Sequence, residues 1–259
     1  MAERPVTEIE STPVQLENIT FAYGRDPVIE NVSFHCPQGS TTALIGASGS
    51  GKTTLIRLIA RFYDVNKGAI KIGGTDIRQF DYDTLMSEIA IIFQDVYLFD
   101  TTIRENLLIA KPDATAAELK EAAANARLDE MLERLPDGWE TKVGEGGLQL
   151  SGGERQRVSI ARAFLKQARI VLIDEAASAL DPENEQAISK AIANIANDKD
   201  KTVIVIAHRP ATIQAANQIV VLDKGKVAET GIPVHLLNRN GRYAAFIRQH
   251  RQRKEWKIE

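Results

Sequence analysis

Hydrophobic residues recur along this chain with two different periods. Alternating or continuous apolar runs are typical of half-buried and buried strands. They predict strands at residues 14–23, 29–36, 41–45, 68–72, 89–93, 170–173, 202–207 and 219–222, and a short edge strand at 227–229. Apolar residues spaced three and four apart predict helices at residues 54–62, 115–126, 128–135, 184–197, 234–237 and 242–248. Because strands and helices alternate, we predict an α/β protein with a mostly parallel sheet.

Two parts of the chain depart from this alternation. The first two predicted strands are joined by a turn at residues 24–27, which predicts an antiparallel β subdomain at the N-terminus. The pattern after residue 94 is mostly helical, which indicates an inserted α-helical subdomain. We therefore expect a linker at residues 1–13 and one domain at 14–259, with a core at 14–94 and 168–250 and a helical subdomain at 95–167.

Composition and charge exclude several classes of protein. The hydrophobic fraction of 44% is enough to build a large core. A net charge of −3 argues against a nucleic-acid-binding protein, which usually carries a basic face. The single cysteine, Cys36, excludes both a disulfide framework and a cysteine metal cluster. The chain has no run of eighteen apolar residues and residues 1–13 lack an apolar signal core, so we expect a cytosolic location and no membrane span.

One loop has the chemistry of a phosphate clamp. Between a predicted strand and a predicted helix the chain reads Gly46-Ala47-Ser48-Gly49-Ser50-Gly51-Lys52-Thr53. Glycines allow successive N–H groups to point at an anion, and the start of the following helix adds the positive end of its dipole. Lys52 can contact the outer phosphates and the Thr53 hydroxyl can ligate Mg²⁺, so the loop predicts that ATP and Mg²⁺ bind here.

Two carboxylates follow the predicted strand at residues 170–173. In open α/β sheets, ligands bind beyond the carboxyl ends of the strands. Asp174 is therefore predicted to hold Mg²⁺, through water and opposite Thr53, and Glu175 to orient or deprotonate an attacking water. The two acids could instead cap the next helix, but the presence of the phosphate loop favours the catalytic interpretation.

A second anion site is predicted at residues 150–156, which read Leu-Ser-Gly-Gly-Glu-Arg-Gln. Ser151 and Glu154 have the spacing of a capping box. A capping box does not need two glycines, however, and Gly152 and Gly153 leave the helix N-terminus bare enough to bind an anion together with Ser151. A chain with two anion sites either binds two anions or shares one between two copies.

With these motifs, the chain resembles the ATP-binding domain of ABC transporters over essentially all of residues 14–248. The resemblance rests on motifs in the family's order, namely the phosphate loop (Walker A), Gln94 (Q-loop), residues 150–156 (signature), Asp174 and Glu175 (Walker B), residues 178–181 (D-loop) and His208. It implies a P-loop NTPase core and a head-to-tail dimer that closes around two ATP molecules. Each ATP would lie between the Walker A loop of one copy and Ser151 and Gly153 of the other.

The resemblance also implies a role for each motif residue. Glu175, His208 and Gln94 are the implied catalytic residues: His208 holds the γ-phosphate, and Gln94 senses Mg²⁺ and the attacking water. Tyr23 is implied to stack on adenine, and Asp181 to cross the dimer interface. The implied nucleotide-binding residues are Tyr23, Gly46, Ser48, Gly49, Ser50, Gly51, Lys52, Thr53, Thr54, Ser151, Gly152, Gly153, Glu154 and Asp181. The implied Mg²⁺ ligands are Thr53, Gln94 and Asp174.

Two further stretches, residues 94–106 and 143–147, resemble exporter-type transporters. In that family Glu145 lies in the X-loop, which contacts the coupling helices of a membrane domain. We therefore expect a membrane domain fused upstream of Met1 that contacts residues 95–106 and Glu145, at the cytoplasmic face of the membrane. The expected partners are this domain and a second ATP-binding domain, with no nucleic acid. Other stretches, residues 61–64 among them, look most like exporter-fold transporters that handle iron-siderophores, some of which import.

Two other classes of protein share parts of this pattern. A soluble relative that uses ATP for DNA repair or chromosome organisation would carry a long coiled coil or zinc cysteines between Walker A and the signature. This chain has a compact helical block there and no such cysteines. A regulatory module that binds ATP without hydrolysing it would be expected to lack Glu175 or His208, and both are present. The sequence therefore favours an ATPase.

Overall fold

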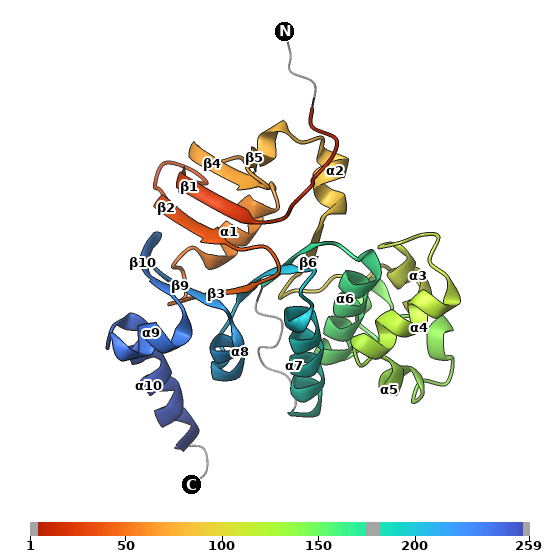
Figure 1. The fold of residues 1–259 in the computed structure, drawn as a ribbon. Helices are drawn as coiled ribbons and strands as arrows, with labels where there is room; N and C mark the ends of the chain where they lie inside the picture. Colours follow the sequence, from red (N-terminus) through yellow and green to blue (C-terminus); the bar gives the residue numbers. More distant parts are fainter. Residues whose placement is uncertain (1–4, 175–181, 256–259) are drawn as a thin grey trace. The chain divides into compact units, whose positions relative to one another are not determined.

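The computed structural model describes residues 5–174 and 182–255, and the chain divides into two compact units. The first unit comprises Met1–Glu88 and Lys199–Glu259, and the second comprises Ile89–Asp198 (Figure 1). Within the described ranges, no helix combines the length and the apolar character needed to cross a lipid bilayer.

An antiparallel sheet with the strand order β2-β1-β4-β5 forms one part of the first unit. Its strands are β1 (Val14–Phe21), β2 (Ile29–Cys36), β4 (Lys67–Ile72) and β5 (Thr75–Asp76). Alternate residues of β2, Val32, Phe34 and Cys36, are buried, as the period of a half-buried strand requires. The predicted antiparallel N-terminal subdomain is confirmed by the antiparallel pairing of β1 with β2.

A second sheet of the first unit contains the strand that leads into the phosphate loop. Its strands lie in the order β10-β9-β3-β8 and are β3 (Thr41–Gly46), β8 (Thr202–Ile206), β9 (Gln218–Asp223) and β10 (Lys226–Gly231). β3 runs parallel to β8 and β9, while β10 is antiparallel to β9. Because β3 is buried on both faces, nearly all its residues are apolar or threonine. Since β3 and β8 run parallel, their carboxyl ends meet at one edge of this sheet.

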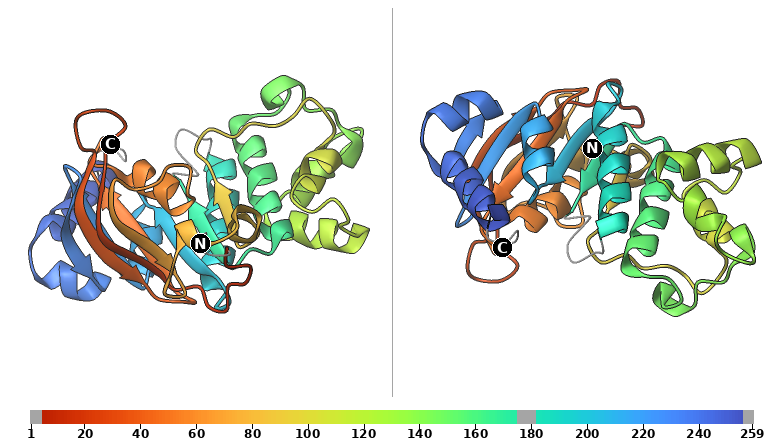
Figure 2. Two further views of the ribbon diagram at one scale, coloured as in Figure 1. Left: turned by 90° about the horizontal axis from the view of Figure 1, so that it is seen from above. Right: turned by 90° about the horizontal axis from the view of Figure 1, so that it is seen from below.

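The α-helices in the described part of the first unit are α1 (Lys52–Ile59), α2 (Tyr82–Ser87), α8 (Pro210–Ala215), α9 (Pro233–Asn238) and α10 (Arg242–Glu255). α1 packs on β3 and β8, and α9 and α10 pack on β10 (Figure 2). The sequence analysis missed α2 and α8. Each has only six residues, so its helical period is a weak signal, although the equally short α9 was predicted.

The second unit is built around the helix α6 (Gly152–Lys166), on which other helices pack. β6 (Ile89–Ile92) pairs in parallel with β7 (Ile170–Ile173), and α6 packs on β6. Three other helices pack on α6: α3 (Ile103–Leu108), α4 (Ala116–Asn125) and α7 (Pro182–Asn197), while α5 (Asp129–Leu132) packs on α4. This unit contains the predicted helical block together with β6, β7 and α7, and the subdomain limits at residues 95 and 167 stay a prediction.

The thiol of Cys36 is predicted to report on unfolding. Cys36 is fully buried on β2, and burial raises the pKa of its thiol to about 12. Since the thiolate is the reactive form, a thiol reagent at pH 8 should modify the native chain at least about 10³-fold more slowly than the unfolded chain. Reaction rates measured with and without denaturant test this, and equal rates would contradict the burial of this strand.

Candidate functional site

The phosphate loop joins the end of β3 to the start of α1. Gly51 is the residue before the helix and has φ 103°, a left-handed conformation that favours glycine. A Cβ at this position would lie 2.6 Å from Cδ1 of Ile29. The Leu55 N–H donates to the Gly51 carbonyl at 3.0 Å, which starts the helix directly at the loop. The strand–loop–helix context predicted for this motif is thus confirmed.

Lys52 is folded against its own loop. Its Nζ donates to the carbonyls of Gly46 at 3.0 Å and Ala47 at 2.9 Å, and the residue is only 7% exposed. The ammonium group is therefore held at the loop by backbone acceptors, where it can interact with an anion bound in the loop.

The chemistry of this loop fits a phosphate group. The Ser50 hydroxyl is buried and has no hydrogen-bond partner in the part of the chain that the structure describes. A bound phosphate oxygen would give this orphan hydroxyl the acceptor that it lacks. Thr53 is half-buried in the first turn of α1, and Thr54 beside it is buried. Hydroxyl, carboxylate and amide oxygens are the donors that Mg²⁺ prefers, so the types of Thr53, Asp174 and Gln94 suit that ion.

His208 lies near the same edge of the sheet as the phosphate loop. It comes two residues after the end of β8, and the intervening Ala207 donates its N–H to the carbonyl of Leu44 on β3 at 3.1 Å. The ring is half-buried. The first unit thus brings His208 and the end of β3, which leads into the phosphate loop, to the carboxyl ends of two adjacent parallel strands.

Tyr23 belongs to a cluster of three aromatic rings. Its ring is 4.9 Å from that of Phe21 and 5.1 Å from that of Tyr63, in both cases edge to face. Its hydroxyl donates to Oγ1 of Thr54 on α1 at 3.4 Å, and the side of the ring that remains is open, since Tyr23 is 48% exposed. The sequence analysis missed Tyr63, although an aromatic residue soon after a phosphate-loop helix was a visible signal.

Tyr63 is predicted to hold the ring of Tyr23 in position for adenine. An aromatic pair contributes about 0.5–1.5 kcal/mol, so Tyr63→Ala should weaken ATP binding by about 2–12-fold, while Tyr63→Phe should bind normally. Titration with ATP and with inorganic tripolyphosphate measures the effect. Tripolyphosphate has no adenine, so its affinity should not change, and equal losses for the two ligands would contradict this role.

The second unit places Gln94 and Asp174 after two adjacent parallel strands. Asp174 directly follows β7, is 6% exposed, and donates its N–H to the carbonyl of Ile92 on β6 at 2.8 Å. Gln94 follows β6 and is exposed. Gln156 of α6 donates to the carbonyl of Phe93 at 3.2 Å and so ties the residue before Gln94 to the signature helix.

Two residues assigned to the site, Glu175 and Asp181, lie outside the described residues. The remaining assigned residues fall into two groups. Tyr23, the phosphate loop and His208 belong to the first unit, whereas Gln94, residues 151–154 and Asp174 belong to the second. The assignment of both groups to one nucleotide stays a prediction.

The signature segment forms the capping box that its spacing predicts. The Glu154 N–H donates to Oγ of Ser151 at 3.3 Å, and Oε2 of Glu154 accepts from the Ser151 N–H at 2.7 Å. Ser151 and Gly152 are exposed at the start of α6, whereas Gly153 is buried. A Cβ on Gly153 would lie 2.4 Å from Cγ of Asn184 on α7. Close helix packing therefore requires Gly153, independently of any anion.

The two segments expected to meet a membrane domain lie side by side. A Cβ on Gly146, next to Glu145, would lie 3.8 Å from the ring of Tyr97, and the rings of Tyr97 and Phe99 are 5.5 Å apart. Two large side chains of residues 95–106 are exposed, Tyr97 at 58% and Phe99 at 53%, and Leu148, which follows residues 143–147, is 82% exposed. An exposed group of this kind is typical of a protein interface.

Arg162 of α6 was missed by the sequence analysis. Its guanidinium donates to the carbonyls of Asn106 at 2.7 Å and Tyr97 at 3.1 Å, and burial lowers its pKa to about 10. Asn106 is fully buried and donates in turn to the carbonyls of Phe99 and Thr102. The helix that begins at the signature is therefore bound directly to residues 97–106. An arginine on the otherwise apolar stretch at residues 160–165 was the available signal.

Comparison with known proteins identifies relatives of the whole chain. A family model described as "ABC transporter" matches residues 29–178. The chain is 45% identical over 232 residues to the putative multidrug export ATP-binding/permease protein YgaD of Bacillus subtilis. The aligned region covers 89% of this chain and 40% of YgaD. It is 43% identical over 245 residues to the mycobactin import ATP-binding/permease protein IrtB of Mycolicibacterium thermoresistibile. That aligned region covers 95% of this chain and 42% of IrtB.

A solved structure has the same fold. The structure of a bacterial Atm1-family ABC exporter with ATP bound matches with a TM-score of 0.90 and 40% identity. The match covers 96% of this chain and 44% of the exporter. The chain thus spans less than half the length of each of these relatives.

Proposed function

Because the chain belongs to the ABC transporter family, we propose that it binds and hydrolyses ATP to drive an exporter-type transporter. The observation that carries this proposal is the phosphate loop, in which Lys52 is held by two backbone carbonyls and Ser50 is buried without a partner among the described residues. The relatives YgaD and IrtB are both described as ATP-binding/permease proteins, which supports a permease part as partner of this domain.

The proposed reaction uses residues from both units. Lys52 and the loop N–H groups hold the outer phosphates, and His208 holds the γ-phosphate. Glu175 directs a water molecule in line and accepts its proton while the water oxygen forms a bond to the γ-phosphorus. The bond from the γ-phosphorus to the β–γ bridging oxygen breaks, and ADP leaves with that oxygen. A Mg²⁺ ion held by Thr53, Asp174 and Gln94 would neutralise charge on the phosphates. Ser151 and Gly153 of a second copy complete the site from the other side of the nucleotide.

The partner surface is proposed to include residues 95–106 and Glu145. The exposed rings of Tyr97 and Phe99 supply apolar area, and Arg162 connects them to the helix that carries Ser151. This connection supports a direct path between a permease part docked on the surface and the γ-phosphate. The proposed location is the cytoplasmic face of a membrane.

We expect that this domain does not contact the transported cargo. One relative is described as a multidrug export protein and another as a mycobactin import protein, with 45% and 43% identity. IrtB supports the resemblance to siderophore-handling transporters, and YgaD supports an exporter to the same degree. The near-equal identities agree with a domain that does not touch the cargo.

A test of the shared site mixes two inactive variants. Lys52→Ala removes the phosphate loop function, and Gly152→Asp places a negative charge at the signature. Gly152 is exposed, and an acidic residue is favourable at a helix N-terminus, so the second variant should fold. In a head-to-tail dimer, the mixed pair contains one intact site, and ATP hydrolysis should reappear on mixing. No recovery, together with wild-type turnover per chain that does not change with protein concentration, would overturn the proposal.

A further inference from the structure

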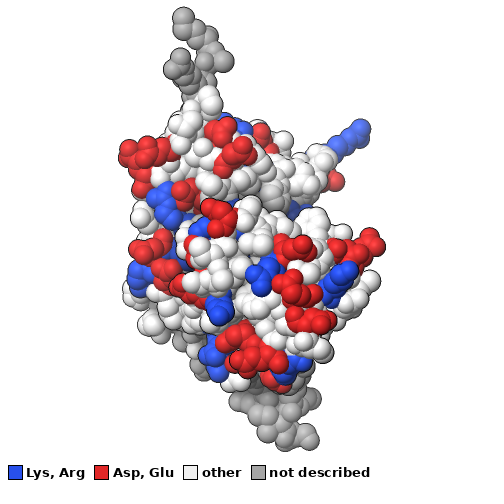
Figure 3. Space-filling model, turned by 90° about the vertical axis from the view of Figure 1, so that its right-hand side faces the viewer, with Lys and Arg blue, Asp and Glu red and all other residues white. Residues whose placement is uncertain are grey.

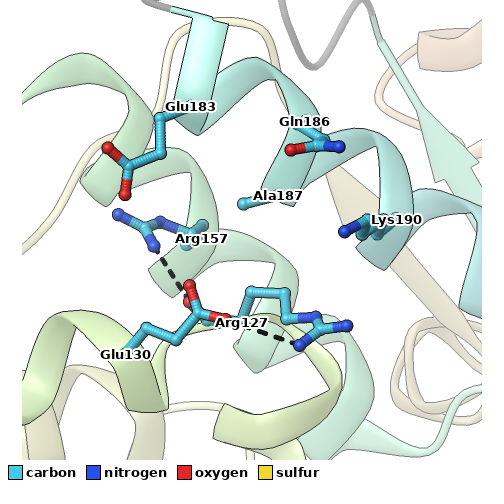
Figure 4. A pocket seen from close by; sticks show the side chains of 7 residues that line it. All are labelled: Arg127, Glu130, Arg157, Glu183, Gln186, Ala187 and Lys190. Atoms are coloured by element: carbon cyan, nitrogen blue, oxygen red, sulfur yellow. Dashed lines mark hydrogen bonds and ion pairs between the residues drawn. The ribbon is translucent and has the colours of Figure 1, made fainter.

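The second unit contains a pocket of about 70 Å³ that involves none of the residues assigned to ATP. Figure 4 shows its lining side chains, which come from the region of α5, from α6 and from α7. The polar and charged members of the lining are Arg127, Glu130, Arg157, Glu183, Gln186 and Lys190.

Arg157 is the buried member of this lining, with 3% of its surface exposed. Its Nη1 donates to the backbone carbonyl of Arg127 at 2.9 Å, while its Nε is buried and has no hydrogen-bond partner among the described residues. Burial lowers the pKa of this guanidinium, yet arginine remains charged at neutral pH. A buried cation with an unfilled donor is costly unless an anion or acceptor comes to it.

The carboxylates of the pocket are already engaged. Oε1 of Glu130 lies 3.4 Å from Nη1 of Arg127, and Oε1 of Glu183 lies 3.6 Å from Nη1 of Arg134. Lys190 is exposed and forms no ion pair within the described part of the chain. Three cations line the pocket against two carboxylates. Glu154, Glu130 and Glu183 act on the charge of Arg157, so Lys190 is the lining cation without an ion pair among the described residues. The excess of cations in the pocket lining differs from the molecular face in Figure 3, where acidic and basic side chains are interspersed.

We propose that this pocket binds a small oxyanion of the size of phosphate or sulfate between Arg157 and Lys190. A volume of about 70 Å³ has room for several ordered waters and therefore for a tetrahedral oxyanion. The guanidinium of Arg157 and the ammonium group of Lys190 supply positive charge and charge-assisted donors, and Gln186 also lines the pocket. The anion links α6, the helix that begins at the signature, to α7, the helix that follows residues 175–181.

The first experiment locates the anion directly. Crystals of the full chain are soaked in selenate, an oxyanion whose selenium gives an anomalous signal. The proposal expects an anomalous peak in the pocket between the Arg157 guanidinium and the Lys190 ammonium group, in addition to any peak at the phosphate loop. A peak at the phosphate loop alone would overturn it.

The second experiment measures affinity in solution with matched variants. Phosphate is titrated at constant ionic strength, and the shift of the thermal unfolding midpoint gives an apparent Kd. Lys190→Gln should raise the Kd of the pocket by about tenfold, and Glu183→Gln should lower it because a facing negative charge is removed. Lys120→Gln on α4 removes the same charge from an exposed site and should leave the Kd unchanged.

Repeating the titration in a chain that carries Lys52→Ala separates binding in the pocket from binding at the phosphate loop. Addition of Lys190→Gln to that chain should still raise the Kd of the pocket. Arg157→Gln should abolish binding in the pocket; if that variant does not fold, the Lys190 and Glu183 variants decide. Equal Kd values for Lys190→Gln and Lys120→Gln would overturn the proposal. The result does not depend on ATP hydrolysis, so the oxyanion site and the proposed function can fail separately.

Discussion

Replacement of Glu175 by glutamine is expected to lower ATP turnover by at least about 10²–10⁴-fold, the usual contribution of a general base. Glutamine keeps the size of the side chain but cannot accept the proton of the attacking water. Glu175 directly follows Asp174, which is buried at the end of β7. ATP should still bind, and the dimer should persist because its nucleotides are not hydrolysed.

Three measurements check this prediction: steady-state phosphate release, ATP affinity at equilibrium, and size-exclusion chromatography with ATP and Mg²⁺. The matched control is Glu121→Gln, which makes the same replacement at an exposed position of α4 and should behave as wild type. If the Glu175 variant hydrolysed ATP at the wild-type rate, Glu175 would not be the general base.

The replacement of Lys52 by alanine is expected to cost most of the affinity for ATP. Hydrogen bonds to a charged group contribute about 1.5–3 kcal/mol, which corresponds to roughly a 10–150-fold rise in Kd. Lys52 is 7% exposed and held by the carbonyls of Gly46 and Ala47, so its ammonium group is already at the loop before a phosphate arrives. Titration with a nucleotide at equilibrium measures the loss.

The comparison between ATP and AMP separates the role of Lys52 from damage to the loop. AMP has no outer phosphates, so its affinity should change little, whereas a collapsed loop would weaken both ligands. Thermal unfolding of the variant shows whether the two carbonyls freed by the substitution destabilise the chain. An unchanged affinity for ATP would contradict the assignment of Lys52 to the outer phosphates.

Much of the fold could be predicted because its signals are local. β2 and β7 begin and end at the predicted residues, since alternating and continuous apolar runs translate directly into strands. The capping box of Ser151 and Glu154 formed as predicted, because both residues lie within one helical turn. Helices of six residues contain fewer than two turns and give a weak signal, so that α9 was predicted but α2 was not.

The sequence by itself determined the α/β class, the phosphate loop between strand and helix, and the motifs that place the chain among ABC transporters. Each of these depends on residue types at short, set spacings. Only the tertiary structure brought Tyr63 to the edge of Tyr23, Asn184 against Gly153, and Arg162 onto Asn106. Those pairs are separated by 31 to 56 residues, and no spacing rule joins positions so far apart. Their distances follow from how sheets and helices pack, because packing brings distant segments together only after the local elements exist.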